Sequence, residues 1–149
     1  MTTPARLLFV CVHNAGRSQM AAAFFNVMSH ERCARARSAG TQPVDHVWPE
    51  VVTAMHERDV DLDSARPQPL TPELVRDSTM IVTLGCGDAV DAQGVPTQDW
   101  PFDDPHDQPP GIVRKIRDAI EKRVWKLIVK QGWVRLQPRA LPSFGAPAT

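Results

Sequence analysis

Apolar residues along the chain occur in short runs and in longer stretches where they recur every three or four residues. The runs at residues 6–12 and 79–85 lack the polar alternation of a half-exposed strand, so they predict buried strands of a parallel sheet. A third stretch, residues 34–40, is rich in small residues and ends at a glycine, which favours another short strand. These three segments are the expected strands.

Four further stretches have features typical of helices. Residues 18–31 place apolar side chains on one face, namely Met20, Phe24, Val27 and Met28. Residues 49–60 begin with a proline, and residues 71–78 begin with a capping threonine followed by a proline. The clearest helix is residues 111–131, where the apolar residues at three- and four-residue steps are Ile112, Ile116, Ile120, Val124 and Leu127.

The order of these elements predicts the fold class. Strands that alternate with helices form right-handed α/β units around a parallel sheet, and ligands bind beyond the carboxyl ends of such strands. Residues 86–110 have no periodicity and are rich in Gly, Pro and Asp, so we expect a functional loop there. The Pro-rich residues 134–149 predict a flexible C-terminal tail.

Length, charge and cysteine content narrow the class of protein. A chain of 149 residues suits one domain, and its 17 basic and 17 acidic residues balance, so we expect neither nucleic acid nor a membrane surface as a partner. No apolar stretch approaches the roughly 20 residues that span a bilayer, and no secretory signal is evident, which favours a cytoplasmic location. The cysteines fit neither a disulfide framework nor a zinc site: Cys11, Cys33 and Cys86.

The segment CVHNAGRS, residues 11–18, joins a predicted strand to a predicted helix and contains the candidate chemistry. Unpaired N–H groups at the helix start, with the small Ala15 and Gly16, allow the loop to curl around a tetrahedral anion. Arg17 adds a planar cation for two oxygens of phosphate or arsenate, and the same field favours Cys11 as a thiolate. A cysteine after an apolar strand can also be a small buried residue. The strand–loop–helix context favours a nucleophile beneath a bound oxyanion.

The same segment resembles the low-molecular-weight tyrosine phosphatase superfamily, and NAGRSQMA is similar to its arsenate reductase branch. The motifs SAGT, TLGCGDA and WPFDDP follow in the order expected of that branch. The resemblance covers residues 5 to about 130. It implies one domain, residues 5–131, with a four-stranded parallel sheet flanked by helices on both faces.

The resemblance also implies roles for the residues of this loop. Cys11 would be the nucleophile and Arg17 the oxyanion clamp, while Asn14 would hold the shape of the loop. Ser18 would donate a hydrogen bond to the thiolate. The residues expected to bind the oxyanion are Val12, His13, Asn14, Ala15, Gly16, Arg17 and Ser18.

A carboxylic acid is expected to complete the reaction, because the oxygen that leaves arsenate or a phosphate ester needs a proton. In the family this acid is the Asp directly before a Pro in a long loop, which is Asp104 in this chain. Asp103 is the alternative. Taken without the resemblance, this Asp-Asp-Pro sequence predicts a simple turn, because Asp and Pro favour turns for local reasons.

Two functions share this first step. A phosphatase hydrolyses the thiol-bound intermediate with water, whereas a reductase resolves it with a second thiol. The phosphatase branch typically has aromatic residues, often Tyr, after its Asp-Pro, and this chain contains no Tyr. Cys86 matches the resolving cysteine of the reductase branch, although it can also be a core residue at a strand end. The sequence therefore favours thiol-dependent arsenate reduction, with a weak phosphatase activity; a protein tyrosine or small-molecule phosphatase is the alternative.

Two features of the branch are missing from this chain. Thioredoxin-linked members carry a third cysteine beyond the second, but no cysteine follows Cys86, and Cys33 is interpreted as structural. An external thiol is therefore expected, either a small thiol with a glutaredoxin-like protein or thioredoxin. Members that hold potassium carry an acidic residue where this chain has Ala22, so no metal is expected.

Other interpretations stay open at this stage. An oxyanion-binding protein without catalysis is a third class, although Cys11, Arg17 and Asp104 are all present. Phosphate and sulfate are expected to compete with arsenate. His13 either tunes Cys11 or faces solvent, and the other histidines show no ligand spacing in the sequence.

Overall fold

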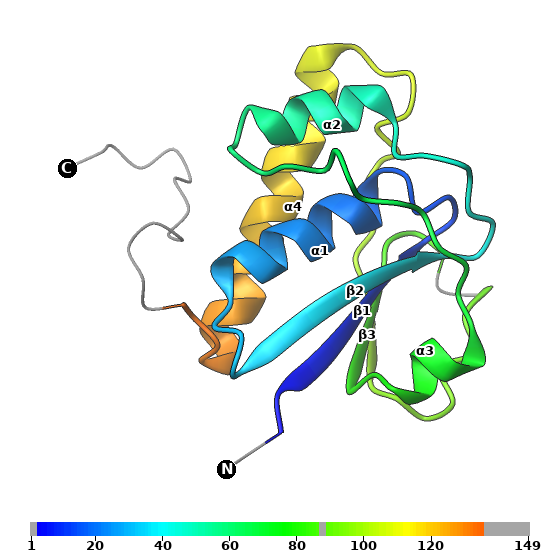
Figure 1. Cartoon of the computed structure of the whole chain (residues 1–149), viewed down its shortest axis with the longest axis vertical. Helices are drawn as coiled ribbons and strands as arrows, with labels where there is room; N and C mark the ends of the chain where they lie inside the picture. Colours follow the sequence, from blue (N-terminus) through cyan, green and yellow to red (C-terminus); the bar gives the residue numbers. More distant parts are fainter. Residues whose placement is uncertain (1–2, 87–88, 136–149) are drawn as a thin grey trace.

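The computed structural model describes residues 3–86 and 89–135, and these residues form a parallel four-stranded sheet with helices on both faces (Figure 1). The sheet has the order β2-β1-β3-β4. Its strands are β1 (Ala5–Cys11), β2 (Ala34–Gly40), β3 (Met80–Thr83) and β4 (Thr97–Asp99). Every neighbouring pair is parallel. The expected four-stranded parallel sheet is confirmed.

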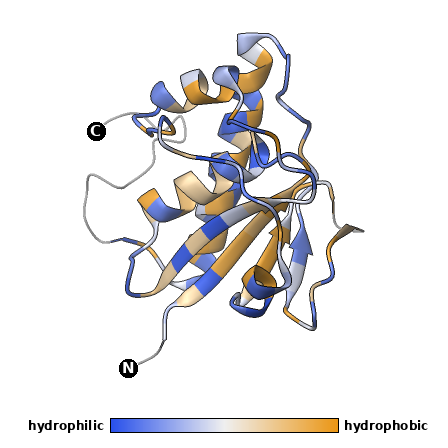
Figure 2. Ribbon diagram, turned by 45° about the vertical axis from the view of Figure 1, so that its right-hand side comes forward, coloured by the Kyte–Doolittle hydropathy of each residue, from blue (hydrophilic) through white to orange (hydrophobic). Residues whose placement is uncertain are grey.

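The helices divide between the two faces of the sheet. On one face lie α1 (Arg17–Met28), α2 (Pro49–His56) and α4 (Pro110–Gln131); on the other lies α3 (Pro72–Arg76) (Figure 1). Strand β1 is buried on both sides, because Leu7 and Phe9 join the core under α1 and α4, whereas Leu8 joins the core under α3. Figure 2 shows hydrophobic residues along the middle strands and both hydrophobic and hydrophilic positions along the helices. The unbroken apolar run of β1 reflects this two-sided burial.

Several helix boundaries and faces differ from the expectation. Helix α1 ends at Met28, and Val27 is 40% exposed although we expected it on the buried face. Phe25 is buried in its place, since its ring packs on those of Phe9 and Trp133. In α4, Ile112 is likewise 40% exposed, whereas the other apolar residues of the predicted stripe are buried.

The long loop after Cys86 contains a strand that the sequence pattern did not predict. Strand β4 has three residues, all exposed, and pairs only with β3 at the edge of the sheet. Such a short polar strand leaves no alternation to detect. It positions the chain that follows, because the main-chain N–H of Trp100 donates to the carbonyl of Thr83 and the Trp100 ring is buried against Phe9.

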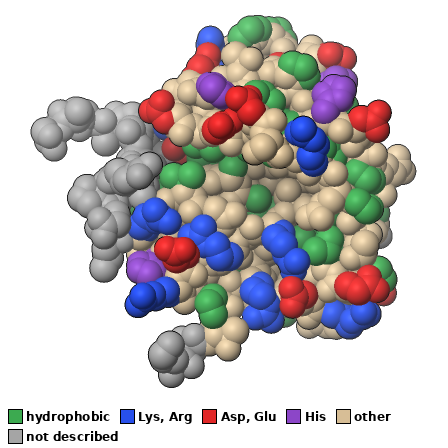
Figure 3. All heavy atoms as spheres, viewed as in Figure 1, with side chains coloured by type: hydrophobic (Ala, Val, Ile, Leu, Met, Phe, Trp, Pro, Cys, Tyr) green, Lys and Arg blue, Asp and Glu red, His purple; other side chains and the backbone are tan. Residues whose placement is uncertain are grey.

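The opposite edge strand, β2, has its free edge covered by side chains. The amide of Asn26 bonds both the N–H and the carbonyl of Ala36, at 2.8 and 2.9 Å. On the face of β2 towards α3, Arg37 forms an ion pair with Asp77 at the end of α3, and basic side chains gather over this part of the molecule in Figure 3. Charged and capped edges hinder pairing with a strand of another molecule.

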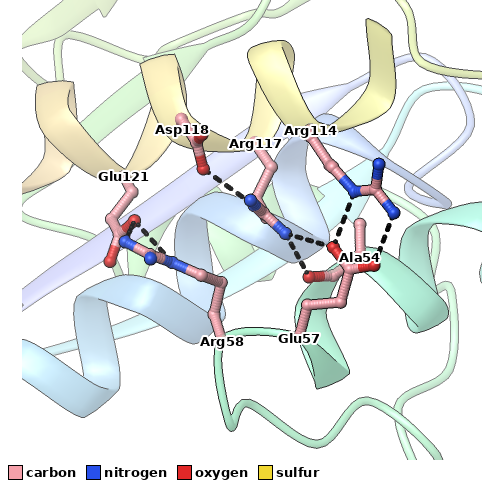
Figure 4. A network of polar contacts seen from close by, with 7 residues as sticks. All are labelled: Ala54, Glu57, Arg58, Arg114, Arg117, Asp118 and Glu121. Carbon is pink, nitrogen blue, oxygen red and sulfur yellow. Dashed lines mark hydrogen bonds and ion pairs between the residues drawn. The ribbon is translucent and has the colours of Figure 1, made fainter. Parts of the chain in front are cut away.

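Helix α2 is fixed to α4 by a network of ion pairs (Figure 4). Arg117 of α4 is buried and donates to the carbonyl of Ala54 and to Glu57, at 2.9 and 2.8 Å. Arg114 contacts the same carboxylate through two hydrogen bonds of 3.0 Å. These bonds set the position of α2, whose first turn lies beside the candidate site.

At the C-terminal end of the described chain, Val134 pairs with Ser29, and the N–H of Arg135 donates to the carbonyl of Met28. Residues 136–149 of the predicted tail lie outside the described residues, so its flexibility stays a prediction. None of the described helices combines the length and the hydropathy that crossing a membrane requires.

Candidate functional site

Cys11 is the last residue of β1, and its side chain lies directly beneath the loop that leads into α1. The residue is 2% exposed, and its Sγ lies 2.9 Å from Oγ of Ser18 in the first turn of α1. The Nδ2 of Asn14 donates to the same Oγ at 2.7 Å. Because this contact uses a lone pair of the hydroxyl, the Ser18 proton is available to the sulfur. Ser18 is therefore placed to donate a hydrogen bond to the Cys11 sulfur.

The loop between β1 and α1 turns its carbonyl groups outward. The carbonyl oxygens from Cys11 to Gly16 all accept hydrogen bonds from groups outside the loop; the donors are the N–H groups of Thr41, Gln42, Val44, Trp48 and Met20 and the side chain of Gln19. Within the described chain, none of the N–H groups of residues 12–17 donates to a protein acceptor. Free N–H groups at the start of a helix form a binding site for an anion.

Asn14 holds the curl of this loop. It is fully buried and adopts a left-handed backbone conformation, with φ of 50°. Its Oδ1 accepts the N–H of Gln68 at 2.9 Å, which fixes the orientation of the amide and directs Nδ2 to Ser18. The end of β2 packs closely beneath, since a Cβ on Gly40 would lie 2.7 Å from the carbonyl of Val12. The role that the resemblance implied for Asn14 agrees with these contacts.

Arg17 is the first residue of α1, and its guanidinium is held by the chain that follows β4. One terminal nitrogen donates to the carbonyl of Phe102 at 3.0 Å, and the other lies 4.0 Å from Oδ2 of Asp104. Gly85 allows this approach, because a Cβ there would lie 3.0 Å from the guanidinium and its φ is +92°. Arg17 and Asp104 are thus brought together across 87 residues of sequence.

Asp104 and its neighbour Asp103 differ in their surroundings. Besides its contact with Arg17, Asp104 accepts the N–H of His106 at 3.0 Å. Asp103 makes no hydrogen bond or ion pair with any other described residue. The carboxyl group that faces the oxyanion loop is therefore Asp104, the residue favoured by its position before Pro105.

Cys86 follows β3 and lies beside the same loop. Its Sγ donates to the carbonyl of Val10 at 3.3 Å, and the residue is 8% exposed. Burial, and then the nearby Cys11, raise the pKa of the Cys86 thiol. The residue also lines a pocket of about 460 Å³, together with Val12, Thr41, Gln42, Gly85, Ala89 and Asp99. Cys86 is near the oxyanion loop, protonated and largely covered.

Cys33 lies at the other end of the sheet. Its carbonyl accepts the N–H of Ala5, the first residue of β1, whereas Cys11 is the last. Seven strand residues rise about 20 Å from first to last. Cys33 therefore cannot reach Cys11 within this fold, which agrees with its interpretation as a structural residue.

An aromatic rim beside the loop was not found from the sequence. The rings of Trp48 and His106 stack at 3.7 Å, and His13 meets the edge of Trp48 at 5.9 Å. A Cβ on Gly16 would lie 3.0 Å from Pro105 and 3.3 Å from Trp48, so the loop and this rim are in contact. These residues come from loops without periodicity, and no sequence signal connects them.

Two groups of side chains bring ligand-type atoms within 4.8 Å of one another: Glu50, His106 and Asp107, and His56, Asp61 and Asp63. The second group is fully exposed. In the first group the N–H of Asp107 donates to Glu50, whereas the buried Nδ1 of His106 lies 3.4 Å from Glu50 and makes no hydrogen bond with the described residues.

The comparisons with known proteins agree with this geometry. The sequence model of the family described as "Low molecular weight phosphotyrosine protein phosphatase" matches residues 6–137. A Halobacterium salinarum protein named "Putative arsenate reductase" is 40% identical over 121 residues, which are 78% of this chain and 85% of that protein. The "Glutaredoxin arsenate reductase" of a Synechocystis species is 29% identical over 129 residues, 84% of this chain and 97% of that one.

A solved structure of similar fold is the thioredoxin-dependent arsenate reductase of Corynebacterium glutamicum, with a TM-score of 0.73 and 33% sequence identity. The similarity covers 89% of this chain and 64% of that one, so this chain spans less than two thirds of that relative.

Proposed function

The chain belongs to the low molecular weight phosphotyrosine protein phosphatase family, and from that membership and its site geometry we propose that it reduces arsenate to arsenite with an external thiol. The observation that carries the proposal is the oxyanion loop with the Cys11 sulfur beneath it and Arg17 at its rim. The relatives named as arsenate reductases direct the choice of substrate.

In the first step, the Cys11 thiolate attacks the arsenic of bound arsenate. A sulfur–arsenic bond forms and an arsenic–oxygen bond breaks, and Asp104 gives its proton to the leaving oxygen, which departs as water. Arsenic is still pentavalent in this adduct. The free N–H groups of the loop and Arg17 balance the negative charge of the remaining oxygens.

In the second step, a second thiolate attacks the Cys11 sulfur. A disulfide forms and the sulfur–arsenic bond breaks, with its electron pair going to arsenic. Arsenic is reduced from the pentavalent to the trivalent state and leaves as arsenite, while the two thiols are oxidised. The disulfide must then be reduced by an external donor.

The surroundings of Cys86 support an external source for the second thiol. Its thiol is covered, hydrogen-bonded and has a raised pKa, so little of it is thiolate at neutral pH. A small external thiol that attacks the adduct directly avoids this limit, and a glutaredoxin-like protein would clear the mixed disulfide. Thioredoxin, through a Cys11–Cys86 disulfide, is the second route.

The family name also supports a weak phosphatase activity, because attack of the thiolate on phosphorus needs the same loop and the same acid. Phosphate and sulfate, which share the tetrahedral shape and charge of arsenate, are expected to compete for the loop.

The test supplies arsenate with either a small thiol and a glutaredoxin, or with thioredoxin and its reductase, and measures arsenite. We expect turnover by the wild-type chain with the small thiol, and retained turnover by Cys86→Ser with that donor. Cys33→Ser is the matched control and should behave as the wild type. Loss of turnover in Cys86→Ser with every donor would make Cys86 an obligatory relay. Absence of arsenite from the wild type with both donors contradicts the proposed function.

A further inference from the structure

The segment that contains Asp104, residues 102–107, is held at both of its ends; we call it the acid segment. At its start, Arg17 donates to the carbonyl of Phe102 at 3.0 Å. At its end, the N–H of Asp107 donates to Oε2 of Glu50 at 2.7 Å. Glu50 belongs to the first turn of α2, an element that the reaction steps above do not use. Asp104 therefore lies in a segment that is bonded to Arg17 at one end and to α2 at the other.

Glu50 also reaches Asp104 through His106. The same Oε2 lies 3.4 Å from Nδ1 of His106, a contact that is an ion pair when the imidazole is protonated and is not a hydrogen bond. The His106 ring stacks on Trp48 at 3.7 Å with an angle of 19° between the planes. The main-chain N–H of His106 donates to Oδ1 of Asp104 at 3.0 Å. Holding the His106 ring therefore also holds the N–H that orients the acid.

Besides its contacts with Arg17 and Glu50, the acid segment is anchored by Pro105 against the oxyanion loop, by the His106 ring on Trp48 and by the hydrogen bond from the N–H of Gln108 to the carbonyl of Pro105. Of its side chains, Pro105 is buried, while those of Asp103, Asp104 and Asp107 are exposed. Asp107 adopts a left-handed backbone conformation with φ of 59°, which is unfavourable for a residue other than glycine and persists only where the surroundings hold it. The hydrogen bond from its N–H to Glu50 is made at that residue.

The charge of Glu50 suits this role. Burial by itself raises the pKa of Glu50, but the hydrogen bond from Asp107 and the neighbouring His106 outweigh burial, and the pKa is lowered from its usual value. Glu50 is therefore a carboxylate at neutral pH, and the facing groups are His106 and, beyond it, Asp107.

We infer that Glu50 is a positioning residue, which ties the acid segment to α2 and so holds the carboxyl of Asp104 over the oxyanion loop. It does not contact the oxyanion. This inference rests on the proposed function for the role of Asp104, but the attachment of the acid segment to α2 does not depend on the substrate.

The structure offers matched variants for the test. Glu50→Ala removes both contacts, whereas Glu50→Gln keeps an oxygen that accepts the N–H of Asp107 and loses only the charge beside His106. Glu73→Ala is the control, because Glu73 follows a proline in the first turn of α3 as Glu50 does in α2, and among the described residues its side chain pairs only with Arg76.

The first measurement is the single-turnover rate with arsenate, and the affinity for arsenate is measured beside it. We expect Glu50→Ala to lower the rate by about 10- to 10²-fold, the scale for a misplaced catalytic group, with the affinity changed less than about twofold. Glu50→Gln should lie closer to the wild type, and Glu73→Ala should equal it. In an Asp104→Asn background, Glu50→Ala should have almost no further effect, because it acts through that acid. An unchanged rate, a loss in affinity alone, or an equal loss in both backgrounds overturns the inference.

The second measurement, hydrogen exchange of the Asp107 amide, is independent of activity. Exchange should be faster in Glu50→Ala than in the wild type and unchanged in Glu73→Ala. Unchanged exchange in Glu50→Ala overturns the inference even if arsenate is turned over. If the wild type does not reduce arsenate, the proposed function fails, and the same pair of variants is then compared on a small aryl phosphate, where the expected and contradicting results are the same.

Discussion

One hydroxyl group connects the shape of the oxyanion loop to its chemistry. Ser18 accepts a hydrogen bond from Asn14 and lies 2.9 Å from the Cys11 sulfur, and Asn14 is oriented by the N–H of Gln68. Cys11, the proposed nucleophile, is therefore connected through hydrogen bonds to a residue 57 positions away in the sequence. The sequence motif indicated Cys11, Asn14, Arg17 and Ser18, because they lie within eight residues. It did not indicate Gln68, since no short motif includes it.

Asp103 and Asp104 provide a matched pair of variants at the same scale. Asp104→Asn should slow the first chemical step by about 10²–10⁴-fold, the usual contribution of a general acid. Asp103→Asn should have a much smaller effect, because Asp103 does not contact Arg17 whereas Asp104 lies 4.0 Å from it. Pre-steady-state rates of adduct formation for both variants measure this difference. The reverse order would assign the acid to Asp103.

At the scale of elements, α2 contributes to the site because α4 holds it. Its first turn contains Glu50, which contacts the acid segment, and its last turns contact Arg114 and Arg117 of α4 (Figure 4). The pKa of Glu57 is lowered to about 2, chiefly by its hydrogen bonds to Arg114 and then to Arg117. A lowered pKa in the folded chain means that ionised Glu57 stabilises the fold.

The stability that Glu57 contributes should therefore depend on pH. It is fully present above the ordinary carboxyl value of 4.5 and is lost as the pH falls towards about 2. Glu57→Gln should have a lower melting temperature than the wild type at neutral pH, and the two curves should converge between pH 5 and about 2. Thermal unfolding followed across this range by circular dichroism measures the convergence.

The control for this experiment is Glu73→Gln, whose exposed side chain forms a surface ion pair with Arg76. Such pairs contribute little to stability, so this variant should follow the wild type at every pH. A constant difference between Glu57→Gln and the wild type down to pH 2 would show that the ion pairs of Glu57 are not its cause.

The helices and strands differ in whether the sequence pattern predicted them. Helices α1 and α4 were predicted because each is long enough for a helical period to appear, and strand β1 was predicted from its unbroken apolar run. Strand β4 was not, since its three exposed residues carry no period. The contact of Trp48 with His106 joins two loops, and its geometry depends on how the sheet brings those loops together.

In the molecule as a whole, the parallel sheet brings segments that are distant in sequence together at the carboxyl ends of its strands. The oxyanion loop follows β1, Cys86 follows β3, and the acid segment follows β4, so the carboxyl ends of three strands supply the site. The α/β class alone predicted that a ligand binds beyond the carboxyl ends of the strands. The separation of Cys33 from Cys11 follows from the same topology, because Cys33 precedes β2 and lies beside the first residue of β1, whereas Cys11 is the last residue of β1.

The proposed role of Cys11 as the nucleophile is tested most directly by measuring arsenite formation by Cys11→Ser. Phosphate binding is measured on the same sample. The loop N–H groups and Arg17 are unchanged in this variant, so phosphate should still bind, and sulfate should displace it. Arsenite formation should fall below detection with every thiol donor, because no sulfur remains beneath the bound oxyanion. Arsenite formed by Cys11→Ser at a rate near that of the wild type would contradict the assignment of Cys11 as the nucleophile.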